Sequence, residues 1–173
     1  LSSLTQGNFA RELSIADGKM PPNAVDFERL VVGTFLIDKK GLDHSIDLLT
    51  PEVFYDPRHS VIFEVILKLY EGNSPVDLMT VIQELKKTDK LASAGGDHYI
   101  IELTMGVSSS AHIEYHVRVI LEKYILRSLI NVSANVIDTS YKESTDVFEL
   151  LDKAEQSFFE ITNGTIKKGF DTA

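Results

Sequence analysis

The C-terminal part of the chain contains its longest stretch without a helix-breaking residue. Residues 107–163 read VSSSAHIEYHVRVILEKYILRSLINVSANVIDTSYKESTDVFELLDKAEQSFFEITN and hold neither glycine nor proline, whereas all five prolines lie between residues 21 and 75. Apolar residues recur there at every third or fourth position, which is typical of an α-helix. Only the polar run Lys142-Glu143-Ser144-Thr145 interrupts this pattern. We therefore predict two helices, over about residues 111–142 and 146–163, joined as a hairpin.

The first predicted arm of this hairpin carries apolar side chains on more than one side. Successive residues of a helix are about 100° apart, so the main apolar face holds Ile113, Val117, Ile120 and Tyr124. A second set lies on the far side of the same helix: Val119, Leu126, Ile130 and Ile137. A helix that is apolar nearly all round is buried on more than one side, and one partner arm can cover only one of them. We therefore expect the second set to form an interface with another copy of the chain.

The second predicted arm carries a clearer apolar stripe, which we expect to pack against the first arm. The stripe consists of Val147, Leu151, Ala154, Phe158 and Ile161. Phe148 and Phe159 lie off this stripe. They are surplus to a contact within the hairpin, so they contact either the globular half of the chain or another protein.

Residues 21–106 contain several shorter stretches with helical spacing, separated by turn residues. We predict a helix over about residues 24–37, a break at Lys39-Lys40-Gly41, and a second helix that reaches Leu49. No stretch alternates with the two-residue period of a strand. The predicted fold class is all-α, with a small globular helical head over residues 21–106 followed by a long two-helix hairpin over residues 107–163.

A few residues of the head have predicted structural roles. Asp56, which precedes Pro57, and Asp77 are expected to cap the N-termini of two helices. Gly33 lies inside a predicted helix, where glycine costs roughly 1 kcal/mol relative to alanine, so we expect it to permit a close helix contact. Gly95 and Gly96 are expected to supply the left-handed conformation that ends a helix.

Composition and charge exclude several classes of function. The net charge is −9 and there is no cysteine. Tight binding of DNA phosphates needs a positive patch, and no basic cluster is present, so we do not expect this chain alone to bind DNA tightly. Without cysteine there can be neither disulfide nor thiolate metal site, as is common in the reducing cytoplasm. The longest apolar run, Leu30 to Ile37, is too short to cross a membrane.

His112 and His116 are the only candidates for a metal site. Two histidines four residues apart on a helix can share a zinc ion, which would make the chain a metallohydrolase. In the metalloprotease pattern, however, the glutamate directly follows the first histidine, whereas Glu114 comes one place later. No third ligand is evident, so this is the weaker alternative.

The two ends of the chain are expected to lie outside the folded parts. Residues 1–20 are predicted to be a flexible leader, and residues 164–173 the start of a linker. Gly164 and Gly169 have the spacing of a phosphate-binding loop, but Phe170 and Asp171 occupy the places of its lysine and its serine or threonine. No nucleotide or metal cofactor is therefore expected in this chain.

Several fragments, taken in order, resemble the N-terminal domain of the DnaB family of replicative DNA helicases. They are Pro21-Pro22 with Glu28 and Val32-Gly33; Thr50-Pro51-Glu52-Val53-Phe54-Tyr55 with His59; Ser74-Pro75-Val76-Asp77; Gly95-Gly96 with Tyr99; and Arg127-Ser128-Leu129-Ile130. The resemblance covers about residues 20–163. It departs at His112, where the family usually has asparagine.

This resemblance implies a non-catalytic assembly domain. Hairpins from two chains would pack together, and dimers would build a hexameric ring that docks primase, with Phe148 and Phe159 as candidate primase contacts. Loader proteins engage the same helicase. ATP and magnesium would belong to a motor domain outside this chain. The rival interpretation is the helicase-interacting C-terminal domain of a bacterial primase, which resembles the same fold; the Pro21-Pro22 start and the sequence after Asn163 favour the helicase.

Overall fold

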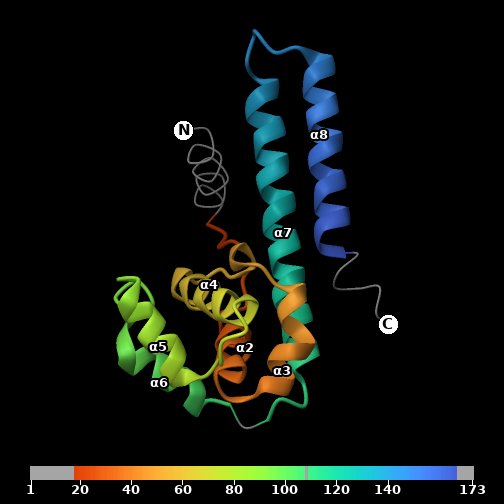
Figure 1. Ribbon diagram of the computed structural model, residues 1–173. Helices are drawn as coiled ribbons and strands as arrows, with labels where there is room; N and C mark the ends of the chain where they lie inside the picture. The colour runs from red at the N-terminus through yellow and green to blue at the C-terminus, as the bar shows by residue number, and fades with distance from the viewer. Residues whose placement is uncertain (1–17, 108, 167–173) are drawn as a thin grey trace. The chain divides into compact units, whose positions relative to one another are not determined.

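The computed structural model describes residues 18–107 and 109–166, and within them the chain is helical and contains no strand (Figure 1). The predicted all-α class is confirmed. Two compact units are present: residues 23–122, called the head unit here, and residues 1–22 together with 123–173, called the hairpin unit. Most of the predicted leader and residues 167–173 of the predicted linker lie outside the described residues. The predicted boundary at residues 106 and 107 stays a prediction.

The head unit is made of short helices. They are α2 (Val25–Ile37), α3 (Lys39–Ser45), the 3-10 turns Ile46–Leu48 and Pro51–Val53, α4 (Pro57–Glu71), α5 (Leu78–Lys87) and α6 (Gly96–Met105). The first turns of the long helix α7 (Ile113–Ser140), as far as Glu122, belong to the same unit.

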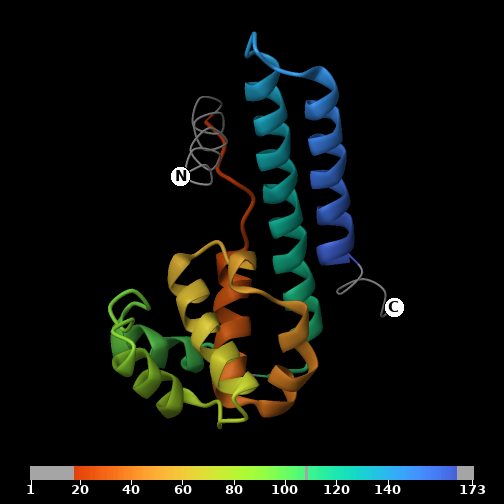
Figure 2. The same cartoon turned by 45° about the horizontal axis from the view of Figure 1, so that its top comes forward.

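Helix α2 lies at the centre of the head unit and contacts α3, α4, α5 and α6 (Figure 2). Its Val31, Val32 and Phe35 are fully buried. Gly33 faces α6 so closely that an added Cβ would collide with the carbonyl oxygen of Leu103. The absence of a side chain at residue 33 therefore sets the distance between α2 and α6.

Local capping signals determine where the helices of the head begin. The Asp56 carboxylate accepts a hydrogen bond from the Arg58 amide and opens α4, with Pro57 in its first turn. The Asp77 carboxylate accepts from the amides of Met79 and Thr80, while the Thr80 hydroxyl accepts from the Asp77 amide. This reciprocal pair is a capping box, which satisfies amide groups that have no partner inside the helix.

Two details of the head differ from the sequence-based expectation. The break after α2 falls at Asp38, whose carboxylate accepts from the Lys40 amide, so that Lys39, Lys40 and Gly41 begin α3 instead of forming a turn. Gly95 and Gly96 do take up the left-handed conformation, with φ of 92° and 81°, but Gly95 is the N-cap of α6 and Gly96 its first residue, so they end no helix. In both places the expectation was wrong because a cap at a helix start was mistaken for a stop.

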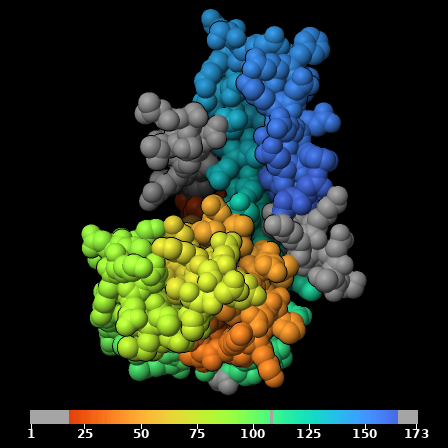
Figure 3. Space-filling model, viewed as in Figure 1, coloured from red at the N-terminus to blue at the C-terminus, as the bar shows by residue number. Residues whose placement is uncertain are grey.

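In the hairpin unit, the part of α7 from Lys123 onward lies side by side with α8 (Val147–Ile161) (Figure 3). The predicted polar run 142–145 does form the turn between them. Asp146 caps α8 by accepting hydrogen bonds from the amides of Phe148 and Glu149. With 28 and 15 residues, the two helices are about 42 Å and 22 Å long.

Candidate assembly and docking surfaces

Only one edge of the predicted apolar stripe of α8 faces α7, because Ala154 is the member of the stripe that lines the groove between the two helices. A groove of about 420 Å³ between the two helices is lined on the α8 side by Leu150, Ala154 and Ser157, and on the α7 side by Val132, Asn135, Val136 and Thr139. Val147, Leu151 and Phe158 of the predicted stripe are exposed instead. For these three residues the expectation was wrong, because helical periodicity identifies an apolar face but not the partner that covers it.

The exposed apolar residues of α8 form one continuous surface, which we call the α8 face. It consists of Val147, Phe148, Leu151, Phe158 and Phe159, whose exposed fractions run from 42% to 79%. At about 100° per residue these positions span roughly 120° of the helix circumference. Phe148 and Phe159 are therefore part of the same surface as the stripe. A contiguous exposed apolar patch of this kind is typical of a protein interaction site.

A second exposed apolar surface lies on α7. Leu126, Ile130 and Ile137 are 38–45% exposed, and Val119, which is partly buried, shares their side of the helix. We call Leu126, Ile130 and Ile137 the α7 face. They point roughly 150° away from the groove that faces α8, so α8 cannot cover them. Their contact with a second copy of the chain stays a prediction.

Arg127 has a partner within the hairpin unit. Its Nη1 donates a hydrogen bond of 2.8 Å to the carbonyl oxygen of Pro22, a residue 105 positions earlier in the chain. The guanidinium also lies 5.8 Å from the centre of the Tyr124 ring. Arg127 therefore fastens the segment that leads into α2 against α7.

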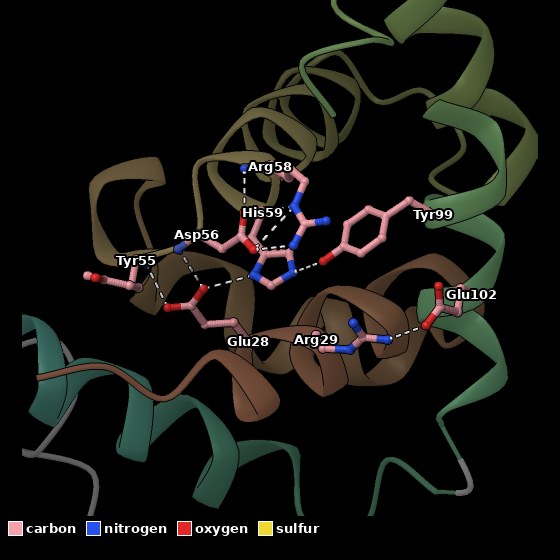
Figure 4. A network of polar contacts seen from close by, with 8 residues as sticks. All are labelled: Glu28, Arg29, Tyr55, Asp56, Arg58, His59, Tyr99 and Glu102. Carbon is pink, nitrogen blue, oxygen red and sulfur yellow. Dashed lines mark hydrogen bonds and ion pairs between the residues drawn. The ribbon is translucent and has the colours of Figure 1, made fainter. Parts of the chain in front are cut away.

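The head unit contains a buried polar network that sequence reasoning did not predict (Figure 4). Both carboxylate oxygens of Glu28 accept backbone hydrogen bonds, from the amides of Tyr55 at 2.7 Å and Asp56 at 3.1 Å. His59 lies between Glu28 and Tyr99, with its Nδ1 2.8 Å from Glu28 Oε2 and its Nε2 2.7 Å from the Tyr99 hydroxyl. Glu28 and His59 are 1% and 0% exposed. The network joins α2, α4 and α6 through side chains that would be costly to bury singly.

The proton positions in this network follow from donor and acceptor chemistry. An ionised carboxylate can only accept, so His59 Nδ1 carries the hydrogen that binds Glu28. When the ring is neutral, its Nε2 is an acceptor, and the Tyr99 hydroxyl donates to it. Burial raises the pKa of Tyr99, which keeps this hydroxyl protonated. Every member of the chain of hydrogen bonds is thereby satisfied.

Two arginines cover the outer side of the network. The Arg58 guanidinium lies 4.0 Å from the centre of the Tyr99 ring and is paired with Asp56. This hydrogen-bonded pairing lowers the pKa of the Asp56 carboxyl. Arg29 makes a 2.8 Å ion pair with Glu102. The arginines are thus held by acidic partners of the same unit, and their arrangement stabilises the head.

A signal for this network was present in the sequence. Glu28 and His59 each occupy a helix position whose neighbours three or four residues away are core residues: Val31 and Val32 for Glu28, and Ile62 and Phe63 for His59. A charged or polar residue on such a face must find a buried partner. The identity of the partner could not be read from the spacing, because the two residues lie 31 positions apart.

His112 and His116 do not gather further metal ligands. His116 packs edge-to-face against Phe27, with ring centres 5.4 Å apart, and burial of the ring lowers its pKa. In the described part of the chain no group of three or more histidine, aspartate or glutamate side chains is arranged to hold a metal ion. Nor is any helix of the described ranges long and apolar enough to span a lipid bilayer.

Comparison with known proteins identifies the family of this chain. Residues 20–122 match the sequence model of the DnaB-like helicase N-terminal domain. The chain belongs to this family. The replicative DNA helicase DnaB of Rhodothermus marinus is 42% identical over 97% of this chain, which corresponds to 18% of that relative. The DnaB of Geobacillus stearothermophilus is 33% identical over 83% of this chain and 32% of its own length. The chain thus spans about a fifth to a third of these relatives.

Solved structures show the same fold beyond the residues that the family match covers. The N-terminal domain of DnaB helicase from Mycobacterium tuberculosis superposes with a TM-score of 0.76 at 31% identity, covering 82% of this chain and 99% of that one. A DnaB-like replicative helicase described with its interactions with primase superposes with a TM-score of 0.64 at 22% identity, covering 85% of this chain and 34% of that protein. This chain therefore has the fold of the DnaB-like helicase N-terminal domain, over more residues than the family match covers.

Proposed function

We propose that this domain organises a ring of helicase subunits, in which hairpins of two chains pair and three such dimers form a hexamer. The observation that carries the proposal is the α7 face, which keeps three large aliphatic side chains exposed on the side that α8 cannot reach. The ATP-driven motor that unwinds DNA would lie outside this chain. Within that arrangement the domain itself performs no chemistry.

The energy available from the α7 face is consistent with pairing. Complete burial of a leucine or isoleucine side chain is worth roughly 1.5–3 kcal/mol. Leu126, Ile130 and Ile137 each have about two fifths of their surface left to bury, so each would contribute on the order of 1 kcal/mol. A symmetric dimer uses the same surface twice, which doubles this gain.

The test of assembly is the mass of the domain in solution. We expect light scattering and sedimentation equilibrium to show a dimer or larger species at micromolar concentration. Leu126→Asp or Ile130→Asp should raise the Kd of self-association at least tenfold and so shift the protein toward the monomer. Helicity in the far-UV should stay unchanged, since both positions are exposed. The matched control is Gln156→Asp, an exposed position of α8 outside both faces. A monomeric unmodified domain at high micromolar concentration would contradict the proposal.

We further propose that the α8 face docks primase. This face contains three exposed phenylalanines, and aromatic anchors in interfaces carry a large share of binding energy. One helicase of the same fold is described in its interactions with primase, which supports the choice of partner. The family match favours this interpretation over a primase domain, since the matched relatives are helicases.

The docking proposal is tested by titrating the primase of the same organism into this domain in a calorimeter. Phe159→Ala and Phe148→Ala should each weaken binding by about 1–3 kcal/mol, or roughly 5- to 150-fold in Kd. Tyr141→Ala is the control, because Tyr141 is an exposed aromatic residue in the turn between the two helices. Unchanged affinity for both phenylalanine variants would place the primase site elsewhere.

A further inference from the structure

The head unit has a groove between α3 and the loop that follows α4. Its volume of about 560 Å³ falls in the range of about 300–1,000 Å³ that is typical of ligand pockets. Helix α3 contributes Leu42 and Asp43 to the lining, and the end of α4 with its loop contributes Tyr70, Pro75 and Val76. These residues belong to neither the α7 face nor the α8 face, so the groove is a separate surface of the domain.

The loop that forms one wall of the groove is held by backbone hydrogen bonds. The amide of Asn73 donates to the Tyr70 carbonyl oxygen at 3.0 Å, and the amide of Ser74 donates to the Leu69 carbonyl oxygen at 2.9 Å. Asn73 has the left-handed conformation, with φ of 51°, which is common where a helix ends in such a turn. The donors of the turn are thus used within the fold, and the groove is preformed.

The lining combines apolar surface with an acidic end. Leu42, Pro75 and Val76 supply aliphatic atoms, and Tyr70 adds an aromatic ring. Burial raises the pKa of the Tyr70 hydroxyl, and the negative charge of Asp43, to which this hydroxyl is hydrogen-bonded, and that of Asp47 raise it further. Both carboxylates therefore act on the end of the groove where the Tyr70 hydroxyl lies.

This negative charge is not neutralised within the described ranges. Neither Asp43 nor Asp47 forms an ion pair there, although Lys39 lines the same groove. Several other acidic side chains of the head do have a lysine or arginine partner: Glu102, Asp56, Glu84, Asp97 and Glu64. The groove therefore presents a negative potential that attracts a cation from outside the unit.

We propose that this groove binds an extended segment of another protein in which an arginine stands beside aliphatic residues. The arginine guanidinium pairs with Asp43 and lies on the Tyr70 ring, since guanidinium groups bind carboxylates and stack on aromatic faces. A carboxylate has about four acceptor sites, so the hydrogen bond from Tyr70 leaves Asp43 free to accept more. The aliphatic neighbours of the arginine occupy the part lined by Leu42 and Val76.

The chemistry of the lining favours this occupant over two others. Phosphate groups of a nucleic acid need a positive surface, and the uncompensated charge here is negative. A hard metal ion needs several oxygen ligands, whereas Asp43 is the one carboxylate among the lining residues and the remainder is largely apolar. A cationic side chain with apolar neighbours matches both parts of the groove.

The test is a titration of the isotope-labelled full chain with the hexapeptide acetyl-GLPRLG-amide, followed by the NMR shifts of backbone amides. We expect saturable shifts confined to residues 39–43 and 70–76. The matched peptide has citrulline in place of arginine, which keeps the shape of the side chain and removes its charge. It should bind about 3- to 10-fold more weakly, because it loses the ion pair and the cation–π contact.

Variants of the protein separate the two contacts. Asp43→Asn should weaken the arginine peptide by about 2- to 5-fold and leave the citrulline peptide unchanged. Tyr70→Leu, which keeps apolar volume without an aromatic face, should weaken the arginine peptide by about 2- to 5-fold. Asp89→Asn is the matched control, because Asp89 is an exposed acidic residue outside the groove, and it should change the affinity by less than about twofold.

The outcomes that overturn the proposal are distinct. Absence of saturable shifts at millimolar peptide, or shifts spread over the whole domain, would show that the groove is no binding site for such a segment. Equal affinity for the arginine and citrulline peptides, or for the protein with Asp43→Asn, would remove the role of charge. Spermidine that produces the same shifts with the same affinity would reduce the site to unselective attraction of cations.

Discussion

Replacing Tyr99 by phenylalanine isolates one hydrogen bond of the buried head network. The change removes only the hydroxyl that lies 2.7 Å from His59 Nε2 and keeps the ring on which Arg58 stacks. His59 is fully buried, so no solvent can replace the lost donor, and an unsatisfied buried acceptor costs about 1–3 kcal/mol. For a chain of this size 1 kcal/mol corresponds to about 2–4 °C in Tm. We therefore expect Tyr99→Phe to lower the unfolding free energy by about 2 kcal/mol and Tm by about 6 °C.

The measurement is urea unfolding followed by circular dichroism, with calorimetry for Tm. All variants are compared at one protein concentration, because self-association contributes to apparent stability. Tyr115→Phe removes the same hydroxyl from an exposed tyrosine of the same unit and should change stability by less than about 0.5 kcal/mol. A loss for Tyr99→Phe that is no larger than that of the control would refute the account of a satisfied Tyr99–His59–Glu28 chain.

Two further predictions concern the head. Gly33→Ala should destabilise the protein by about 1–3 kcal/mol because its Cβ meets the Leu103 carbonyl oxygen, whereas Gly164→Ala, with no neighbour near its Cβ, should be close to neutral in the same urea titration. The pKa of Asp56 is lowered in the folded state, so the stability it contributes is complete above about pH 4 and is lost as the pH falls below that value. Asp56→Asn keeps a capping side chain and should show a shallower loss of unfolding free energy between about pH 5 and 3; parallel curves for the two proteins would contradict this.

The parts of the fold that sequence predicted well depend on local signals. Asp56 with Pro57 and Asp77 with Thr80 satisfy amides at the helix starts within three residues of themselves. The polar run 142–145 separates two helices whose interiors lack glycine and proline. These interactions join residues that are close together in the sequence, so they can be recognised without the tertiary structure. For this reason the all-α class and the hairpin could be predicted.

The parts that sequence predicted poorly depend on which surfaces meet. The periodicity of α8 correctly separates an apolar side from a polar one, but Leu150 and Ser157 line the groove beside Ala154, whereas Leu151 and Phe158, which were expected there, are exposed. The Glu28–His59 pair joins two helices across 31 residues, and spacing alone contains no information on such a pairing. Assignments of partner surfaces failed where assignments of local structure succeeded.

The difference between the two units bears on how the domain works. In the head unit, large apolar side chains and the Glu28–His59–Tyr99 network are both enclosed, so this unit holds the interactions that stabilise it. The hairpin has the opposite distribution: the groove between its helices is lined by polar residues together with aliphatic ones such as Val132, Val136 and Leu150, while its largest apolar side chains on α8, Phe148 and Phe159, are exposed. Burying the larger side chains within the hairpin would have been the more stable choice for an isolated chain. Their exposure therefore supports the proposal that other surfaces cover the hairpin, because a partner that buried these side chains would add to its stability.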